Sequence, residues 1–311
     1  MLPAPPALTT PAPSREVAFP GFNQLPLKGT LQAAQGSTLV ALLVPDSGPL
    51  DRDWRGPKLS GHTGRALAEW LADQGIASLR YDKRMFGAHD RHLDVSLDAQ
   101  VGDLRQALAF LRAQPEAKGR RILLIGHGEG ALLSLLATRD SDALLLLAMP
   151  GQSMALTIRD QITPQLPAEK AAQNLAHLEA TFKAIRQGDP CPTPGPDVYP
   201  ALGKFCTSLM APETLDFVRA TLDLDPWAML ARTLQPVALA WGDRDVQAWK
   251  PAPIPASFHG TVLEVPGANH LFRAETRSRG ELNPGNALEG YGDSTPLADL
   301  AVIGAWLKEV R

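Results

Sequence analysis

The chain has 311 residues, of which 44 % are hydrophobic and 20 % are charged, so it can bury a sizeable core and is not intrinsically disordered. This length suits one large α/β domain as well as two smaller domains. The formal net charge is −3 and no block of like charges occurs, which argues against nucleic acid or an anionic membrane surface as a partner.

The predicted elements alternate between strands and helices in the first half of the chain. Two weaker strand candidates, at residues 16–19 and 25–33, would form a leading antiparallel edge. Strands follow at 38–45, 76–81, 121–127 and 143–149, and helices between them at 65–74, 97–114 and 129–138. The strands are apolar on both faces, which is typical of parallel strands covered by helices on each side. This repetition predicts a doubly wound α/β sheet.

The alternation stops after residue 149 and resumes at residue 236. The intervening segment has helical stretches at 168–187 and 212–221, and a proline-rich loop at 190–200 that we expect to be extended. Strands at 236–241 and 261–265 and a helix at 296–310 complete the chain. Ligands bind at the carboxyl ends of such strands, so a late insertion predicts a cap there. We therefore expect a core of residues 1–150 and 231–311, and a cap of residues 151–230.

Two observations bear on the cellular compartment. No apolar run reaches the length of a membrane span, and the first 15 residues lack the basic and apolar regions of a signal peptide. We expect a soluble protein, either cytoplasmic or a mature periplasmic or secreted form. Cys191 and Cys206 lie in one irregular region, where a disulfide and two separate buried thiols are both open.

A glycine-rich turn follows the strand at 121–127. It reads Gly126-His127-Gly128-Glu129-Gly130. The nucleophile elbow, G-x-S-x-G, has this spacing, because side chains at its outer positions would collide with the neighbouring strand and helix. Both outer glycines are present, but Gly128 stands where the serine belongs. The alternative is a glycine-rich phosphate loop, which lacks here the basic residue of a P-loop.

This turn is the third of three motifs that stand in order at successive predicted strand ends. They read SGPLDRD at 47–53, RYDKR at 80–84 and IGHGEG at 125–130. Together they resemble the α/β-hydrolase superfamily, in particular bacterial esterases and serine aminopeptidase-like hydrolases. The corresponding family patterns are G-S-G-P-x-D-R-D, R-Y-D-K-R-G and I-G-H-S-E-G. The resemblance covers about residues 25–150 and 231–311, and implies the α/β-hydrolase fold with a helical cap insertion.

The resemblance also implies the partners of the missing serine. After the next-to-last strand, the pattern G-x-x-D selects Asp245 as the acid, while Asp243 is a competitor whose other role is to cap the turn. After the last strand, G-x-x-H selects His270 as the base. The order elbow, acid, histidine is that of α/β-hydrolases. Backbone N–H groups of Ser47 and Glu129 would form the oxyanion hole.

A few further side chains are candidates for roles near the site. Met85, Met210 and Trp227 would line an apolar substrate pocket, and Met85 stands where the family pattern has glycine. His89 and His92 form a possible metal pair, but their loop supplies no further ligands. We therefore expect no metal and no cofactor.

The glycine at the nucleophile position leaves three hypotheses about function. Gly128 cannot form an acyl-enzyme, although the rest of such a site retains about 10³–10⁴-fold catalysis over water. We rank first an inactivated or altered carboxylic-ester hydrolase that still binds a small ester or related carbonyl compound. A repurposed site with His270 as base or nucleophile is the second hypothesis. A ligand-binding protein without catalysis is the third.

Overall fold

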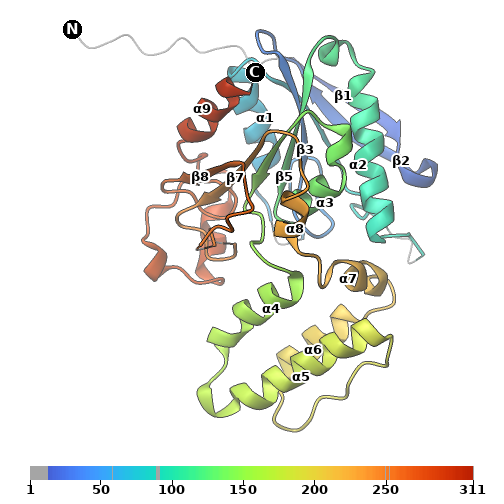
Figure 1. The fold of residues 1–311 in the computed structure, drawn as a ribbon, viewed down its shortest axis with the longest axis vertical. Coiled ribbons are helices and arrows are strands. Elements are labelled where there is room, and N and C mark those ends of the chain that lie inside the picture. Colours follow the sequence, from blue (N-terminus) through green and yellow to red (C-terminus); the bar gives the residue numbers. More distant parts are fainter. Residues whose placement is uncertain (1–12, 58, 89–91, 249, 252, 311) are drawn as a thin grey trace.

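The computed structural model describes residues 13–57, 59–88, 92–248, 250–251 and 253–310. An eight-stranded sheet runs through these residues, in the order β1-β2-β4-β3-β5-β6-β7-β8 (Figure 1). The strands are β1 (Ser14–Pro20), β2 (Pro26–Gln32), β3 (Leu39–Val44), β4 (Ala77–Tyr81), β5 (Arg121–His127), β6 (Ala143–Leu147), β7 (Val237–Gly242) and β8 (Thr261–Val265). β2 is antiparallel to β1 and to β4, and the pairs from β4 to β8 are parallel. The expected strands and leading antiparallel edge are confirmed.

Helices cover both faces of this sheet. The helices that cover the sheet are α1 (Thr63–Asp73), α2 (Leu97–Arg112), α3 (Glu129–Leu136) and α9 (Ala301–Glu309). Alternate residues of a strand point to opposite faces. Val40 and Leu42 accordingly join one buried cluster with α2 and α3, while Ala41 and Leu43 join another with α1 and α9. The doubly wound α/β sheet is thus confirmed.

Five further helices lie between β6 and β7. They are α4 (Met154–Ile162), α5 (Ala168–Gln187), α6 (Pro200–Leu209), α7 (Leu215–Thr221) and α8 (Pro226–Leu230). Figure 1 shows α4 to α7 as a layer that projects from the sheet. These helices enclose a small apolar cluster of their own, around Leu178, Phe182 and Leu222. This arrangement agrees with the expected cap, whose exact limits stay a prediction.

Several element boundaries differ from the sequence-based expectations. Helices α4, α6 and α8 were not expected, and α6 begins at Pro200, within the segment expected to be a loop. Proline fits the first helical position because its missing N–H would have no partner there. The last helix begins at Ala301, not at 296, because Leu297 forms a bridge with Arg273.

The structure also describes the state of the two cysteines and the length of the helices. Cys191 and Cys206 are free thiols, with Cys206 buried in the cap cluster, so the structure has no disulfide between them. Among the described residues, none of the helices has the length and apolar character needed to cross a membrane.

Candidate active site

The turn between β5 and α3 has the tight geometry of a nucleophile elbow. Gly128 has φ +54° and ψ −118°, a conformation that glycine adopts without strain. A Cβ on Gly126 would lie 2.6 Å from Cα of Ala131, and one on Gly130 would lie 2.5 Å from the carbonyl oxygen of Val44. The two outer glycines are therefore required by the close approach of strand and helix.

The place of the missing serine side chain is taken by Asp46. A Cβ on Gly128 would lie 2.5 Å from Oδ2 of Asp46 and closer still to Oδ1, well inside van der Waals contact. Asp46 comes two residues after the end of β3, which is the neighbour of β5 in the sheet. Gly128 thus provides the room that the carboxylate of Asp46 occupies.

This carboxylate fills the expected oxyanion hole. The backbone N–H groups of Ser47 and Glu129 both donate to Oδ1 of Asp46, at 2.6 and 2.8 Å. Its other oxygen, Oδ2, lies 3.2 Å from Nε2 of His270. Burial alone would raise the pKa of Asp46, but the His270 hydrogen bond and the nearby imidazoles hold it well below its usual range. Asp46 is therefore an anion held by main-chain donors.

His270 lies between two carboxylates. Its Nδ1 is 2.8 Å from Oδ2 of the fully buried Asp245, whose Oδ1 accepts from the N–H groups of Gln247 and Ala248. Burial opposes a charged imidazole, but Asp245 and Asp46 outweigh it and raise the pKa of His270 to about 10. Without other ligands, His270 is therefore an imidazolium at neutral pH and has no free lone pair.

The competing acid has a different position. Oδ1 of Asp243 accepts from the N–H of Gly267 at 2.7 Å, which joins the turn after β7 to the turn after β8. The structure therefore gives Asp243 the turn-holding role, and places Asp245 at His270.

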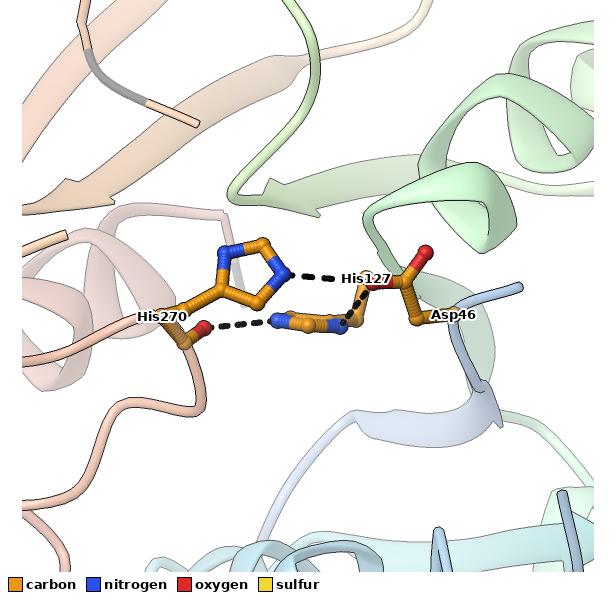
Figure 2. A group of neighbouring side chains, drawn as sticks. All are labelled: Asp46, His127 and His270. Atoms are coloured by element: carbon orange, nitrogen blue, oxygen red, sulfur yellow. Dashed lines mark hydrogen bonds and ion pairs between the residues drawn. The ribbon is translucent and has the colours of Figure 1, made fainter. Parts of the chain in front are cut away.

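His127 is the last residue of β5, immediately before Gly128, and is fully buried. Its Nε2 is 2.7 Å from the carbonyl oxygen of His270, whereas its Nδ1 lies 3.7 Å from Oδ2 of Asp46 and has no hydrogen-bond partner. Burial and the charge of His270 lower the pKa of His127. Figure 2 shows both imidazoles directed at the carboxylate of Asp46.

A buried lysine fixes both loops of the site. Lys83, which follows β4, donates to the backbone carbonyl of Asp46 at 2.9 Å and to Oε1 of Glu129 at 2.7 Å. Its side chain is only 5 % exposed, so this cation bridges the two segments that hold the Asp46 carboxylate.

Comparisons with known proteins come from solved structures and from one short sequence match. An esterase of Pyrococcus furiosus superposes with a TM-score of 0.54 and 16 % identity, covering 96 % of this chain and 91 % of that one. A proline iminopeptidase of Mycobacterium smegmatis gives 0.52 and 15 %, covering 95 % and 98 %. The α/β hydrolase GrgF from Penicillium sp. sh18 gives 0.50 and 16 %, covering 83 % and 91 %. This chain has the α/β-hydrolase fold.

Comparison of sequences gives one short match in addition to the structural similarity. No protein family model matches the chain. The polyketide transferase ATR5 of Stachybotrys chlorohalonatus is 36 % identical over 73 residues, which are 23 % of this chain and 25 % of that protein. The match thus spans about a quarter of the relative's length.

The two charged motifs next to the site form ion pairs with each other. Arg52 pairs with Asp82 at 2.7 Å, and Nε of Arg80 donates to Asp53 at 2.8 Å. These pairs tie the loop after β3 to the end of β4. These arginine–aspartate pairs therefore hold the scaffold, whereas Ser47 and Lys83 of the same two motifs contact Asp46.

A pocket of about 170 Å³ opens beside the Asp46 carboxylate. Its polar end is formed by Asp46, Ser47 and Glu129. Residues of α3, of the end of β6 and of the cap form the rest: Leu132, Met149, Pro150, Gln152, Met154, Thr157, Ile158, Thr221, Leu224 and Pro226. The pocket lies between the carboxyl ends of the strands and the cap helices, where this fold binds its ligands.

The three residues expected to line a pocket are not among these lining residues. Met210 packs against the cap cluster. Trp227 packs against the core and donates its indole N–H to the carbonyl of Gly151 at 2.8 Å. Met85 is half-buried in the turn after β4. His89 lies outside the described residues, and His92 is exposed. Packing of the segment 151–230 decides the positions of Met210 and Trp227, and the sequence pattern does not reveal this packing.

The sequence analysis missed Asp46 and assigned His127 no chemical role. A signal for Asp46 was present, because the family loop pattern begins with glycine one residue before its serine, and Asp46 stands at that place. Compared with the family patterns G-S-G-P-x-D-R-D and I-G-H-S-E-G, this chain gains a side chain at Asp46 and loses one at Gly128. Only the contact between the two loops shows that these departures compensate one another.

Proposed function

We propose that this chain is an altered hydrolase that binds a small ester or related carbonyl compound without forming an acyl-enzyme. The observation that carries the proposal is the Asp46 carboxylate, which lies where the serine side chain of an elbow would lie and contacts His270. The pocket at the strand ends and the esterases among the structural neighbours support a carbonyl substrate.

The fit between Asp46 and Gly128 supports an altered site over a simple loss of the serine. A serine at position 128 would overlap the carboxylate, which would have to leave both main-chain donors and His270. Restoring the serine alone is therefore not expected to restore an ordinary ester hydrolase. Removing the carboxylate at the same time frees the two N–H groups and the imidazole.

The test compares wild type with Gly128→Ser, Asp46→Ala and the Asp46→Ala/Gly128→Ser double variant. Hydrolysis of p-nitrophenyl acetate and butyrate is measured, together with covalent labelling by a fluorophosphonate. We expect labelling only in the double variant, with a gain in hydrolysis of at least about 100-fold over wild type, because the oxyanion donors act again. Adding His270→Ala to the double variant should abolish the gain.

Two results would count against the proposal. A folded double variant that neither hydrolyses the esters nor becomes labelled would show that the scaffold does not bind esters productively. Full activity in Gly128→Ser alone would show that Asp46 does not occupy the serine's place.

A further inference from the structure

The buried nitrogen of His127 lacks a partner in a way that points to a ligand. The carbonyl of His270 can only accept, so the hydrogen of a neutral His127 ring is on Nε2 and donates to it. Nδ1 then carries a bare lone pair, which faces the anionic Oδ2 of Asp46 at 3.7 Å. Two acceptors that face each other in a buried site are stabilised by a cation between them.

His270 presents its second nitrogen to the same oxygen. Its Nδ1 is held by Asp245 at 2.8 Å, and its Nε2 lies 3.2 Å from Oδ2 of Asp46. Histidines that bind metals typically donate their other ring N–H to a carboxylate or a backbone carbonyl, which fixes the ring. Both arrangements occur here, since Asp245 holds His270 and the His270 carbonyl holds His127.

The spacing and chemistry of the three groups suit one ion. One nitrogen of His127, one of His270 and one oxygen of Asp46 all lie within 4.8 Å of one another. Ligands about 2.0–2.2 Å from a zinc ion are roughly 3.0–3.5 Å apart. The separations of 3.2 and 3.7 Å from Oδ2 of Asp46 to the two imidazoles are close to this range. The widest separation in the cluster, within 4.8 Å, would shorten as the imidazoles turn toward a shared ion. Two imidazoles and one carboxylate suit Zn²⁺ better than Ca²⁺ or Mg²⁺, which prefer oxygen ligands.

We propose that Asp46, His127 and His270 bind one divalent transition-metal ion of the Zn²⁺ class. Three protein ligands are the number found in catalytic zinc sites, which keep a further position for water or substrate. The side chain of Asp46 is 24 % exposed and lines the pocket, so this open position faces the pocket. The earlier expectation of no metal, based on His89 and His92 alone, did not consider this cluster.

The use of the ion in catalysis rests on the proposed function, whereas its binding does not. Bound zinc polarises a carbonyl and lowers the pKa of its water. The water oxygen would add to the ester carbonyl carbon, the bond from that carbon to the alcohol oxygen would break, and the alcohol would leave with a proton from the water. Acid and alcohol form from ester and water, and no serine hydroxyl is needed at Gly128.

The experiment titrates metal-free protein with Zn²⁺ by calorimetry and with Co²⁺ by visible absorption. The variants are His127→Gln and Asp46→Asn, with His259→Gln as matched control because His259 is exposed and outside the cluster. We expect one ion per chain, intense visible Co²⁺ bands, and affinity reduced at least about 10–100-fold in both site variants. The control should bind as wild type does.

The proposal is overturned if wild type binds no stoichiometric ion, or if folded His127→Gln binds Zn²⁺ as tightly as wild type. If neither variant folds, the wild-type Co²⁺ spectrum decides the question. Intense visible bands would support the site, whereas a spectrum with only the weak bands of hydrated Co²⁺ would reject it. Zinc binding without zinc-dependent ester hydrolysis overturns the catalytic use of the ion. The serine-restoration test above needs no metal, so failure of the proposed function is distinguished from failure of the site.

Discussion

The replacement of Gly128 by alanine tests the central contact of the site. Two effects add. A non-glycine residue at φ +54° is strained by about 1–3 kcal/mol. The new Cβ would also displace the Asp46 carboxylate from the N–H groups of Ser47 and Glu129. Hydrogen bonds to a charged group contribute about 1.5–3 kcal/mol each, and water in the open pocket replaces part of them. We expect the free energy of unfolding to fall by about 2–6 kcal/mol.

Urea unfolding of four proteins separates the two effects. These are wild type, Gly128→Ala, Asp46→Ala and the double variant. Without the carboxylate, only backbone strain remains, so Gly128→Ala should cost about 1–3 kcal/mol in the Asp46→Ala background. The difference between the two backgrounds is the coupling energy, which we expect to be about 1–3 kcal/mol.

Gly119 provides a matched control for strain. It has φ +71°, and a Cβ there would meet no atom within 4 Å. Gly119→Ala should therefore show strain alone and no coupling to Asp46→Ala. If Gly128→Ala costs no more than Gly119→Ala, or if its effect is the same with and without Asp46, the carboxylate does not occupy the place of an elbow side chain.

Two further predictions concern groups outside the site. Hydrogen bonds from the backbone N–H and the imidazole of His62, together with the charges of His62 and Arg273, outweigh burial and lower the pKa of Asp293 to about 2. The ionised carboxylate therefore stabilises the fold above pH 4, and this stabilisation is lost as pH falls toward 2. Asp293→Asn should cost up to about 1 kcal/mol at pH 7, since the group is half exposed, and a cost that persists at pH 2 would refute the charge effect. Burial raises the pKa of the Cys206 thiol, so a thiol reagent should modify Cys191 first in the native protein. After unfolding without reductant, both thiols should react, and fewer than two modified cysteines per chain would indicate a disulfide.

Local patterns predicted most of the sheet and much of the candidate site. β5, β8 and α5 have the expected limits, because apolar runs of strand length and helical periodicity act over a few neighbouring residues. Helices α4 and α6 escaped prediction, since they pack mainly within the cap and follow proline-rich or irregular segments. The residues that line the pocket could not be predicted either, because they depend on how the cap helices pack against the strand ends.

The sequence by itself determined the α/β-hydrolase fold, the glycine turn without a serine, and the segments that carry Asp245 and His270. Each of these depends on residue types within a few positions of one another. Only the tertiary structure decided that Asp46 fills the place beside Gly128, and that His127 and His270 face the same oxygen. The physical reason is the pairing of β3 with β5, which brings two distant loops into contact at one edge of the sheet.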